Sequence, residues 1–393
     1  METVGIITVH HYGNYGSALQ AYASQKVFEK LGYDTYIIDY RSPNVCYATD
    51  RYMDYNSMDD SYWRKLEKRK RGFVKRAVKA VLSRPNIAQF LYHKLGVTKG
   101  VDLNQFWLKN LKMTRRYNSL RELFSEPPHF DIYVVGGDQL WNTYITYNNP
   151  AYFLAFADKG AKKISFSTSI GIPHIPDEAL PSFKKGMNNL SSILVREDEG
   201  VAYLRSMGYK AERVLDPTLM LTKEEWNQRL DKHYKPAYEK YILVYFLDPT
   251  DWTAELLETV RKQTGLSVIV IGNKQEGNPK TTGYTYTGNI KTDVFLSLFA
   301  NAEIVVTNSF HGIAFTLIFE KLLVATYRGE DSDVSMNSRH RNIVNMFELS
   351  SCLYDRTHFS TERINYKMNY DRIRFLMNEY KRQTFDLLKN ALS

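Results

Sequence analysis

The stretch that decides the fold is GIITVHHYGNYGSALQAYA at residues 5–23, together with the apolar segment TYIIDY at 35–40. The apolar run at 4–9 predicts a strand, and apolar residues at helical spacing predict a helix over 18–31. Residues 10–17 between them form a glycine-containing loop, and residues 34–40 predict a second strand. This order of strand, loop, helix and strand is a βαβ unit, which requires a parallel sheet.

The same alternation of strands and helices recurs along the chain. Further strands are predicted at 131–135, 163–168, 192–195, 213–215, 241–246, 267–271, 302–307 and 322–327, and helices at 197–207, 253–264, 292–300, 313–320 and 370–392. A polar stretch separates two groups of elements, so the sequence predicts an α/β protein with two parallel-sheet halves and a linker near 216–240. We expect domains over 1–220 and 240–365 and a C-terminal helix over 366–393. Residues 41–110 are basic and Tyr-rich, and we interpret them as a helical insertion.

The charge of the chain is concentrated in one segment. The 393 residues carry 52 Lys+Arg against 43 Asp+Glu, a net charge of +9. Ten basic residues and one acid lie between Arg64 and Arg84, which leaves the remainder neutral. Because a nucleic-acid binder usually spreads its excess charge over several elements, we expect no nucleic-acid partner. The apolar spacing within 64–84 indicates a basic amphipathic helix, suited to an anionic membrane surface or to packing on its own domain.

Cysteine usage and hydropathy indicate the compartment. Cys46 and Cys352 are too few for a disulfide framework or a cysteine metal site, which suits a reducing cytoplasm. The apolar run at 4–9 is too short for a signal peptide, and the chain has no run of about 18 apolar residues. We expect a cytoplasmic protein, with 64–84 as a candidate peripheral contact at the inner face of the cell membrane. No third ligand accompanies His10 and His11, so we expect no metal site.

The first candidate site is the loop HHYGNYGS, which contains Gly13, Asn14 and Gly16. It follows a strand and opens a helix, where free backbone N–H groups and the helix dipole favour an anion. Its glycine spacing matches neither the dinucleotide fingerprint nor the phosphate-binding P-loop. A turn that needs glycine explains the loop equally well.

The second candidate site is VVGGDQLWN, which places Gly136, Gly137, Asp138 and Gln139 directly after a predicted strand. Two glycines there let a ligand or a neighbouring backbone come close. Open α/β sheets bind ligands at the carboxyl ends of their strands. The structural alternative is a turn in which Asp138 caps a helix, and we favour the site.

The third candidate is TNSFHG, with Asn308, Ser309, His311 and Gly312, which follows a strongly apolar strand. A histidine at the start of a helix can move a proton near pH 7, although the helix dipole disfavours its charged form. A capping or hydrogen-bonded histidine is the structural alternative. The position at the carboxyl end of a strand favours a functional role.

Two arginines complete the candidate set. Arg196 in LVREDEG follows a short apolar strand and offers a planar fork for a carboxylate or phosphate, although a surface pair with a neighbouring Glu is also common. Arg339 in the cluster SRHR could supply a second anion contact.

Six pieces in this order resemble the polysaccharide pyruvyl transferases. They are GIITVHHYGNYGSALQAYA, VVGGDQLWN, SFSTSIG, LVREDEG, VLDPTLML and VVTNSFHGIAF. The resemblance implies a GT-B-like fold, in which two Rossmann-like domains with parallel sheets face each other across a cleft. It also implies that Arg196 is the anion-binding arginine and His311 the acid/base or donor-contacting histidine. Ser309 stands where the family motif has an arginine. Either another arginine, with Arg339 as the candidate, replaces it, or the donor differs.

The resemblance implies transfer of a pyruvyl group from phosphoenolpyruvate to a sugar of a polysaccharide or lipid-linked oligosaccharide, as a ketal, with no cofactor. In this interpretation His311 and Asp138 are catalytic, and Arg196 with the helix start at Gly312 holds the donor. The glycine loops shape the acceptor side. Two alternatives stay open: a glycosyltransferase that uses a nucleotide sugar on the same fold, and a non-catalytic glycan-binding protein.

Overall fold

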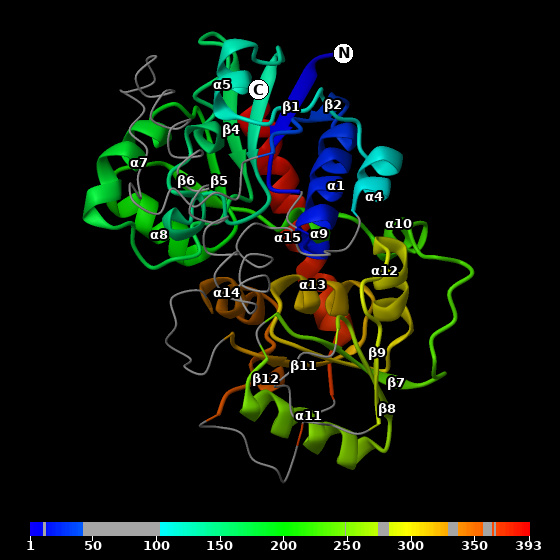
Figure 1. Ribbon diagram of the computed structural model, residues 1–393. Coiled ribbons are helices and arrows are strands. Elements are labelled where there is room, and N and C mark those ends of the chain that lie inside the picture. Colours follow the sequence, from blue (N-terminus) through cyan, green and yellow to red (C-terminus); the bar gives the residue numbers. More distant parts are fainter. Residues whose placement is uncertain are drawn as a thin grey trace, which may run out of the picture.

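The computed structural model describes residues 1–10, 13–41, 103–247, 249–273, 283–328, 337–356, 364 and 367–393. Within these ranges the chain forms two parallel sheets, one built from each half of the sequence (Figure 1). The predicted α/β class and parallel pairing are therefore confirmed. The basic segment 64–84 and most of the predicted insertion lie outside the described residues.

The N-terminal sheet is built around β1 (Thr3–Ile7). Its described strands also include β2 (Asp34–Ile37), β3 (Ile132–Gly136), β4 (Lys162–Phe166), β5 (Ile193–Val195) and β6 (Ala211–Arg213). Four strands pair in the order β2-β1-β3-β4, and β5 pairs with β6. Parallel bridges from Ile164 to Ser192 and from Thr168 to Val195 join β4 to β5. The strand order reverses between β1 and β3, the kind of position where open α/β sheets bind ligands.

Helices cover this sheet on both faces. They are α1 (Tyr15–Lys30), α4 (Asn104–Asn110), α5 (Leu120–Ser125), α6 (Thr143–Thr146), α7 (Leu180–Met187) and α8 (Asp198–Ser206), with short 3-10 turns at Pro150–Phe153 and Asp177–Ala179. The predicted loop at 10–17 is too long, because α1 already begins at Tyr15. The Asn14 side chain accepts hydrogen bonds from the N–H groups of Gly16 and Ser17, and this N-cap starts the helix.

The C-terminal sheet consists, among the described residues, of strands in the order β12-β11-β10-β7-β8-β9. They are β7 (Tyr241–Tyr245), β8 (Ser267–Val270), β9 (Tyr284–Tyr286), β10 (Ile304–Thr307), β11 (Leu322–Thr326) and β12 (Leu353–Tyr354). The helices of this half are α11 (Asp251–Thr264), α12 (Thr292–Asn301), α13 (Phe310–Ile318) and α14 (Ser338–Met346), with a 3-10 turn at Ser350–Cys352. Here the strand order reverses between β7 and β10. Helix α13 begins directly after β10.

Two short helices, α9 (Pro217–Met220) and α10 (Lys223–Asn227), occupy the predicted linker. The predicted strand at 213–215 is wrong in position, because β6 ends at Arg213 and the Leu215 N–H donates to Thr384 Oγ1 on the last helix. That helix, α15 (Tyr370–Leu392), returns from the C-terminal half and runs beside α9 towards the N-terminal sheet (Figure 1). At its end, the Leu392 carbonyl accepts a hydrogen bond of 2.6 Å from Lys162 Nζ.

One apolar core joins the two halves. It contains Leu19 of α1, Leu219 of α9, Phe315 of α13 and Leu388 of α15, all buried. Trp107 of α4 belongs to the same core, so this described end of the predicted insertion is part of the packed body. Separate clusters cover the far face of each sheet. Because burial of apolar area is the main favourable term in folding, this shared core holds the facing ends of the sheets in register. The exact domain boundaries remain a prediction.

Candidate active site

Charged side chains from both halves meet between the two sheets. Asp138 follows β3, Arg196 follows β5, and His311 follows β10 as the second residue of α13. Arg339 comes from the first turn of α14, and Asp216 from the segment that leaves the N-terminal sheet. Parallel strands place their carboxyl ends at one edge, so residues distant in sequence converge there. We call these five residues the interdomain cluster.

Arg196 is the centre of this cluster and is 2% exposed. Its Nη2 lies 2.9 Å from Asp216 Oδ2 and also donates to the carbonyl of Gly137. The guanidinium carbon lies 4.8 Å from the centre of the Phe310 ring, a cation–π contact between the two halves. Nε and Nη1 are buried and have no hydrogen-bond partner in the described part of the chain. Two donors therefore stay available for an anion.

His311 faces the same carboxylate from the other half. Its Nε2 lies 3.8 Å from Asp216 Oδ2 and has no hydrogen-bond partner among the described residues. Burial lowers the pKa of His311 to about 4, although the nearby Asp216 and Asp138 carboxylates act in the opposite direction. The imidazole is therefore neutral at pH 7, and a bound anion would raise its pKa.

Gly16 provides the space for the imidazole. A Cβ atom added to this glycine would lie 2.2 Å from His311 Nδ1, closer than side-chain atoms can approach. The first turn of α1 and the first turn of α13 thus touch through a glycine and a histidine. A glycine is therefore needed at position 16 because another side chain approaches closely, and not because of a turn.

Asp138 lies within reach of the cationic residues, and its side chain is 16% exposed. Its Oδ2 accepts a hydrogen bond of 2.6 Å from Ser17 Oγ, and its Oδ1 lies 4.0 Å from Arg339 Nη1. Burial opposes the charged carboxylate, but Arg196, His311 and Arg339 outweigh it and hold the pKa of Asp138 below its usual range. Asp138 caps no helix, because Asn142 is the N-cap of the next one.

Arg339 brings the second guanidinium to the cluster and is 6% exposed. Burial and the neighbouring Arg196 lower its pKa to about 10, so it stays protonated at neutral pH. The Gln139 side-chain amide lies against this guanidinium. Helix α14 is held on the N-terminal half by Asn342, whose amide accepts from the Asp198 N–H and donates to the Arg196 carbonyl. Thus Arg196, Arg339 and His311 converge.

Several other predicted site residues have structural contacts. Ser309 is the N-cap of α13, and its hydroxyl accepts from the Gly312 N–H at 3.3 Å. The Gly312 N–H itself is therefore occupied by the cap, and a role of this helix start in holding the donor stays a prediction. Asn308 is buried; its side chain accepts from the Leu247 N–H and its carbonyl bonds to His340 Nε2 at 2.8 Å.

The remaining predicted glycines serve backbone geometry. Gly13 and Gly137 have positive φ angles of 70° and 89°. A Cβ atom at Gly136 would meet the Phe166 carbonyl oxygen at 1.8 Å, and one at Gly137 would meet Gln20 Oε1 at 1.7 Å. The close approach predicted at Gly136 and Gly137 is therefore an approach of the protein itself.

Two members of the site were not predicted from the sequence. Asp216 directly follows the predicted strand at 213–215, yet its Oδ2 pairs with Arg196 and lies 3.8 Å from His311 Nε2, and its side chain also caps α9. Glu197 is 1% exposed, and its Oε1 accepts from Ser169 Oγ and from the Ile170 and Gly171 N–H groups. Burial raises the pKa of this carboxyl. Both acids lie in motifs that the family resemblance already includes, LVREDEG and VLDPTLML. Only the contacts in the structure distinguish them from the other residues of these motifs.

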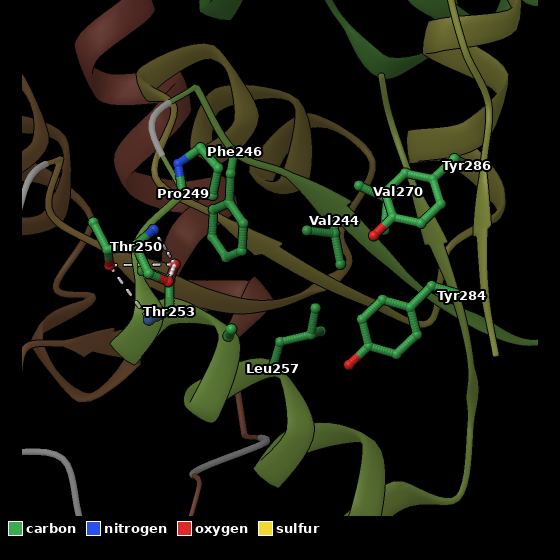
Figure 2. Close-up of a pocket in the computed structure, with 10 residues that line it drawn as sticks. Val244, Phe246, Pro249, Thr250, Thr253, Leu257, Val270, Tyr284 and Tyr286 are labelled. Atoms are coloured by element: carbon green, nitrogen blue, oxygen red, sulfur yellow. Dashed lines mark hydrogen bonds between the residues drawn. The ribbon is translucent and has the colours of Figure 1, made fainter. Parts of the chain in front are cut away.

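A separate hollow lies beside α11 in the C-terminal half (Figure 2). Val244, Leu257, Val270 and Tyr284 line it, and its volume is about 40 Å³. The threonine hydroxyls at its rim belong to a capping box in which Thr250 and Thr253 bond each other, as Figure 2 shows. The hollow is small and apolar and contains none of the cluster residues.

The described residues contain no group of three or more His, Cys, Asp or Glu side chains arranged to hold a metal ion. None of the helices in the described ranges is long and apolar enough to cross a membrane.

Comparison with known proteins places the chain in a family. The model of the polysaccharide pyruvyl transferase family matches residues 14–325, which is most of the chain. The protein therefore belongs to the polysaccharide pyruvyl transferases, a family of enzymes, as the sequence resemblance predicted. No curated protein matches the chain in sequence.

Solved structures show the fold class. UDP-N-acetylglucosamine 2-epimerase from Rickettsia bellii aligns with a TM-score of 0.52 at 9% identity, over 99% of this chain and 96% of that chain. MurG from Acinetobacter baumannii aligns with a TM-score of 0.42 at 8% identity, over 99% of this chain and 100% of that one. The epimerase is a GT-B protein, and the chain has this fold; at 9% identity the likeness extends to the fold alone.

Proposed function

We propose that this transferase moves the pyruvyl group of phosphoenolpyruvate onto two hydroxyls of a sugar in a polysaccharide or lipid-linked oligosaccharide. The observation that supports this most is the convergence of Arg196, Arg339 and His311 between the two sheets. Phosphoenolpyruvate carries a carboxylate and a phosphate, and two buried guanidiniums beside a histidine suit such a compact polyanion.

Arg196 and Arg339 hold the donor in this proposal. Arg196 Nε and Nη1 have no partner among the described residues and are buried, so an anion that accepts from them removes a desolvation cost. Ser309 caps α13, and Arg339 supplies the charge that the family motif places at that position. A guanidinium binds a carboxylate or phosphate through two parallel hydrogen bonds, which fixes its orientation.

The reaction consists of an addition and then a substitution at the same carbon, C2 of phosphoenolpyruvate. First, C3 of phosphoenolpyruvate takes up a proton, and the oxygen of one sugar hydroxyl bonds to C2 while its own proton passes to a base. Then the bond from C2 to the phosphate oxygen breaks, and the second hydroxyl oxygen bonds to C2. The proton of that hydroxyl leaves on the phosphate, so the products are the ketal and hydrogen phosphate.

His311 and Asp138 carry the protons in this proposal. The low pKa of His311 makes its protonated form a strong acid, and the charge of a bound donor favours that protonated form. It therefore protonates C3. Asp138 is ionised and lies on the N-terminal side of the cluster, where it accepts the proton of the first sugar hydroxyl. Such positioned acids and bases typically contribute about 10²–10⁴-fold each.

The test is release of phosphate from phosphoenolpyruvate in the presence of galactose- or mannose-type acceptors. His311→Ala should lower kcat by about 10²-fold or more. The matched control is His129→Ala, because His129 is an exposed histidine paired with Asp158. Undiminished turnover by His311→Ala would remove His311 from the mechanism.

A thermal-shift experiment tests the donor itself. A ligand that binds only the native state raises Tm, because it stabilises that state by RT ln(1 + [L]/Kd). Phosphoenolpyruvate should raise Tm, and Arg339→Ala should reduce that rise at the same donor concentration. A rise with nucleotide sugars and none with phosphoenolpyruvate would favour the glycosyltransferase alternative.

A further inference from the structure

A second cavity lies between α4, the segment after α10 and the start of α12. Its volume is about 230 Å³, and it shares no residue with the interdomain cluster. The lining residues are Phe106, Lys109, Asn110, Gln228, Arg229, Leu230, Lys291, Thr292 and Asp293. Three cations therefore face one carboxylate, and that carboxylate accepts a hydrogen bond from the Val294 N–H. We call this cavity the α12 pocket.

Two polar groups in the α12 pocket are buried and have no hydrogen-bond partner among the described residues. The first is Oγ1 of Thr292, a residue that is 2% exposed. The second is Nε of Arg229, whose Nη1 donates to Asn110 Oδ1 at 3.1 Å. An unsatisfied buried polar group costs about 1–3 kcal/mol. Two such groups on one cavity are accounted for by a ligand that accepts from both.

The start of α12 adds a third element. The residue at the N-cap position of this ten-residue helix is Lys291, whose side chain makes no capping hydrogen bond, while Asp293 in the first turn accepts from the Val294 N–H. The helix dipole favours an anion at this end. Within the described ranges, Lys109, Arg229 and Lys291 form no ion pair with a carboxylate. Asp293 is the one acid among the lining residues, so three positive charges stand against one negative charge in the pocket.

We infer that the α12 pocket binds a phosphate group carried by the acceptor glycan. The assignment of this phosphate to the acceptor glycan rests on the proposed function and on the position of the pocket. The Tyr15 hydroxyl donates to the Ile290 carbonyl at 2.8 Å and accepts from the Ile290 N–H at 3.1 Å. Tyr15 precedes Gly16, which touches His311, and Ile290 precedes Lys291. The contact between Tyr15 and Ile290 thus connects the pocket to the first turn of α1, which touches the proposed catalytic histidine.

The first test measures binding of inorganic phosphate by the full-length protein, at constant ionic strength and without any donor. Thr292→Val removes only the hydroxyl, and the double variant Lys109→Ala/Lys291→Ala removes two charges. Each should raise the Kd of phosphate about tenfold, since hydrogen bonds to charged groups have this magnitude. Lys159→Ala/Lys262→Ala is the charge-matched control, because both lysines are exposed and lie outside the pocket. It should leave Kd unchanged.

Phosphate bound by Arg196 and Arg339 contributes equally in the wild type and in the three variants. The comparison therefore uses the difference in Kd between each variant and the wild type. A Kd that is the same in all four would overturn the pocket. Thr292→Val should also leave Tm without phosphate unchanged or higher, because it removes an unsatisfied hydroxyl. If Thr292→Val instead lowered this Tm, the hydroxyl would have a structural role. A higher Kd of phosphate in that variant would then count against the inference.

The second test identifies the source of the phosphate. We expect a hexose 1-phosphate to bind more tightly than inorganic phosphate or the free hexose, and Thr292→Val to remove this advantage. Equal Kd values for hexose 1-phosphate and inorganic phosphate would overturn the assignment to the acceptor. Neither test contains phosphoenolpyruvate, so their outcomes do not depend on pyruvyl transfer. Failure of the proposed pyruvyl transfer is detected separately, by the assay of phosphate release from phosphoenolpyruvate.

Discussion

Asp216 Oδ2 lies 2.9 Å from Arg196 Nη2 and 3.8 Å from His311 Nε2, so one buried carboxylate oxygen faces the cationic group of one half and the histidine of the other. The other oxygen, Oδ1, caps α9 by accepting from the Thr218 N–H at 2.8 Å. The same aspartate therefore anchors the connecting segment and orders the two residues that the proposed chemistry requires. Its removal affects stability and protonation together.

We expect Asp216→Ala to lower the free energy of unfolding by about 3–5 kcal/mol, because it leaves the buried Arg196 charge without its partner. Asp216→Asn keeps the shape and part of the hydrogen bonding and should lose less. The pKa of His311, which Asp216 raises, should fall further in both variants. Urea unfolding gives the first quantity and an NMR titration of the histidine gives the second. An unchanged His311 titration in Asp216→Asn would contradict the assigned contact.

The buried histidines predict a loss of stability in mild acid. Burial lowers the pKa of His311 to about 4 and that of His340 to about 3, against 6.5 in an unfolded chain. Between those values the unfolded state binds more protons, so stability is fully present above pH 6.5 and falls as the pH decreases. Each histidine should account for about 1 kcal/mol between pH 6.5 and 5.5.

His340→Gln tests this dependence on pH. Glutamine can still donate to the Asn308 carbonyl that His340 Nε2 contacts, but it does not titrate. Urea unfolding at pH 6.5 and 5.5 should therefore show a smaller difference for the variant than for the wild type. Equal differences would mean that His340 titrates normally in the folded protein.

Gly16→Ala should abolish turnover. The added Cβ atom would lie 2.2 Å from His311 Nδ1, so the histidine or the first turn of α1 must shift. Gly160→Ala is the matched control, because a Cβ atom there meets nothing within 4 Å. The measurement is kcat with phosphoenolpyruvate, with circular dichroism to check folding. Wild-type turnover in Gly16→Ala would show that the contact is not needed.

Arg339→Ala should raise the KM for phosphoenolpyruvate about tenfold or more, since a charge-assisted hydrogen bond to an anion is lost. Arg341→Ala on the same helix is the control. Arg341 pairs with Glu199 at 3.0 Å near the surface and lies outside the cluster. Its removal should change KM less than twofold, and equal effects of the two variants would indicate a general loss of charge instead of a donor contact.

The basic segment 64–84 predicts binding to anionic membranes. Lys and Arg near such a surface contribute about 1 kcal/mol each. Vesicles that contain phosphatidylserine should sediment the wild type, and substitution of Lys68–Arg71, Lys75 and Arg76 by Gln should release it. Neutral phosphatidylcholine vesicles serve as the control. Sedimentation that is unaffected by the substitutions would favour packing of this segment on its own domain.

The sequence alone was enough to predict the parallel α/β architecture and the family. Periodicity and loop glycines are local signals, and they placed most strands within two residues of their observed bounds. The sequence also indicated His311, Arg196 and Asp138, because polar residues that follow apolar strands lie at the carboxyl edge of a sheet. Arg339 was indicated by the basic cluster SRHR. What it missed locally was capping: Asn14 and Ser309 start their helices earlier than the apolar pattern predicts.

Only the tertiary structure decided which of these residues meet. Asp216 directly follows a predicted strand, and Ser309 stands in a candidate site motif. Packing pairs Asp216 with Arg196, and the Ser309 hydroxyl accepts from the Gly312 N–H as a helix cap. The α12 pocket combines α4, the linker and α12, which no local pattern connects. Contacts between such distant segments depend on how two sheets dock through a shared apolar core, and that geometry is a property of the whole chain.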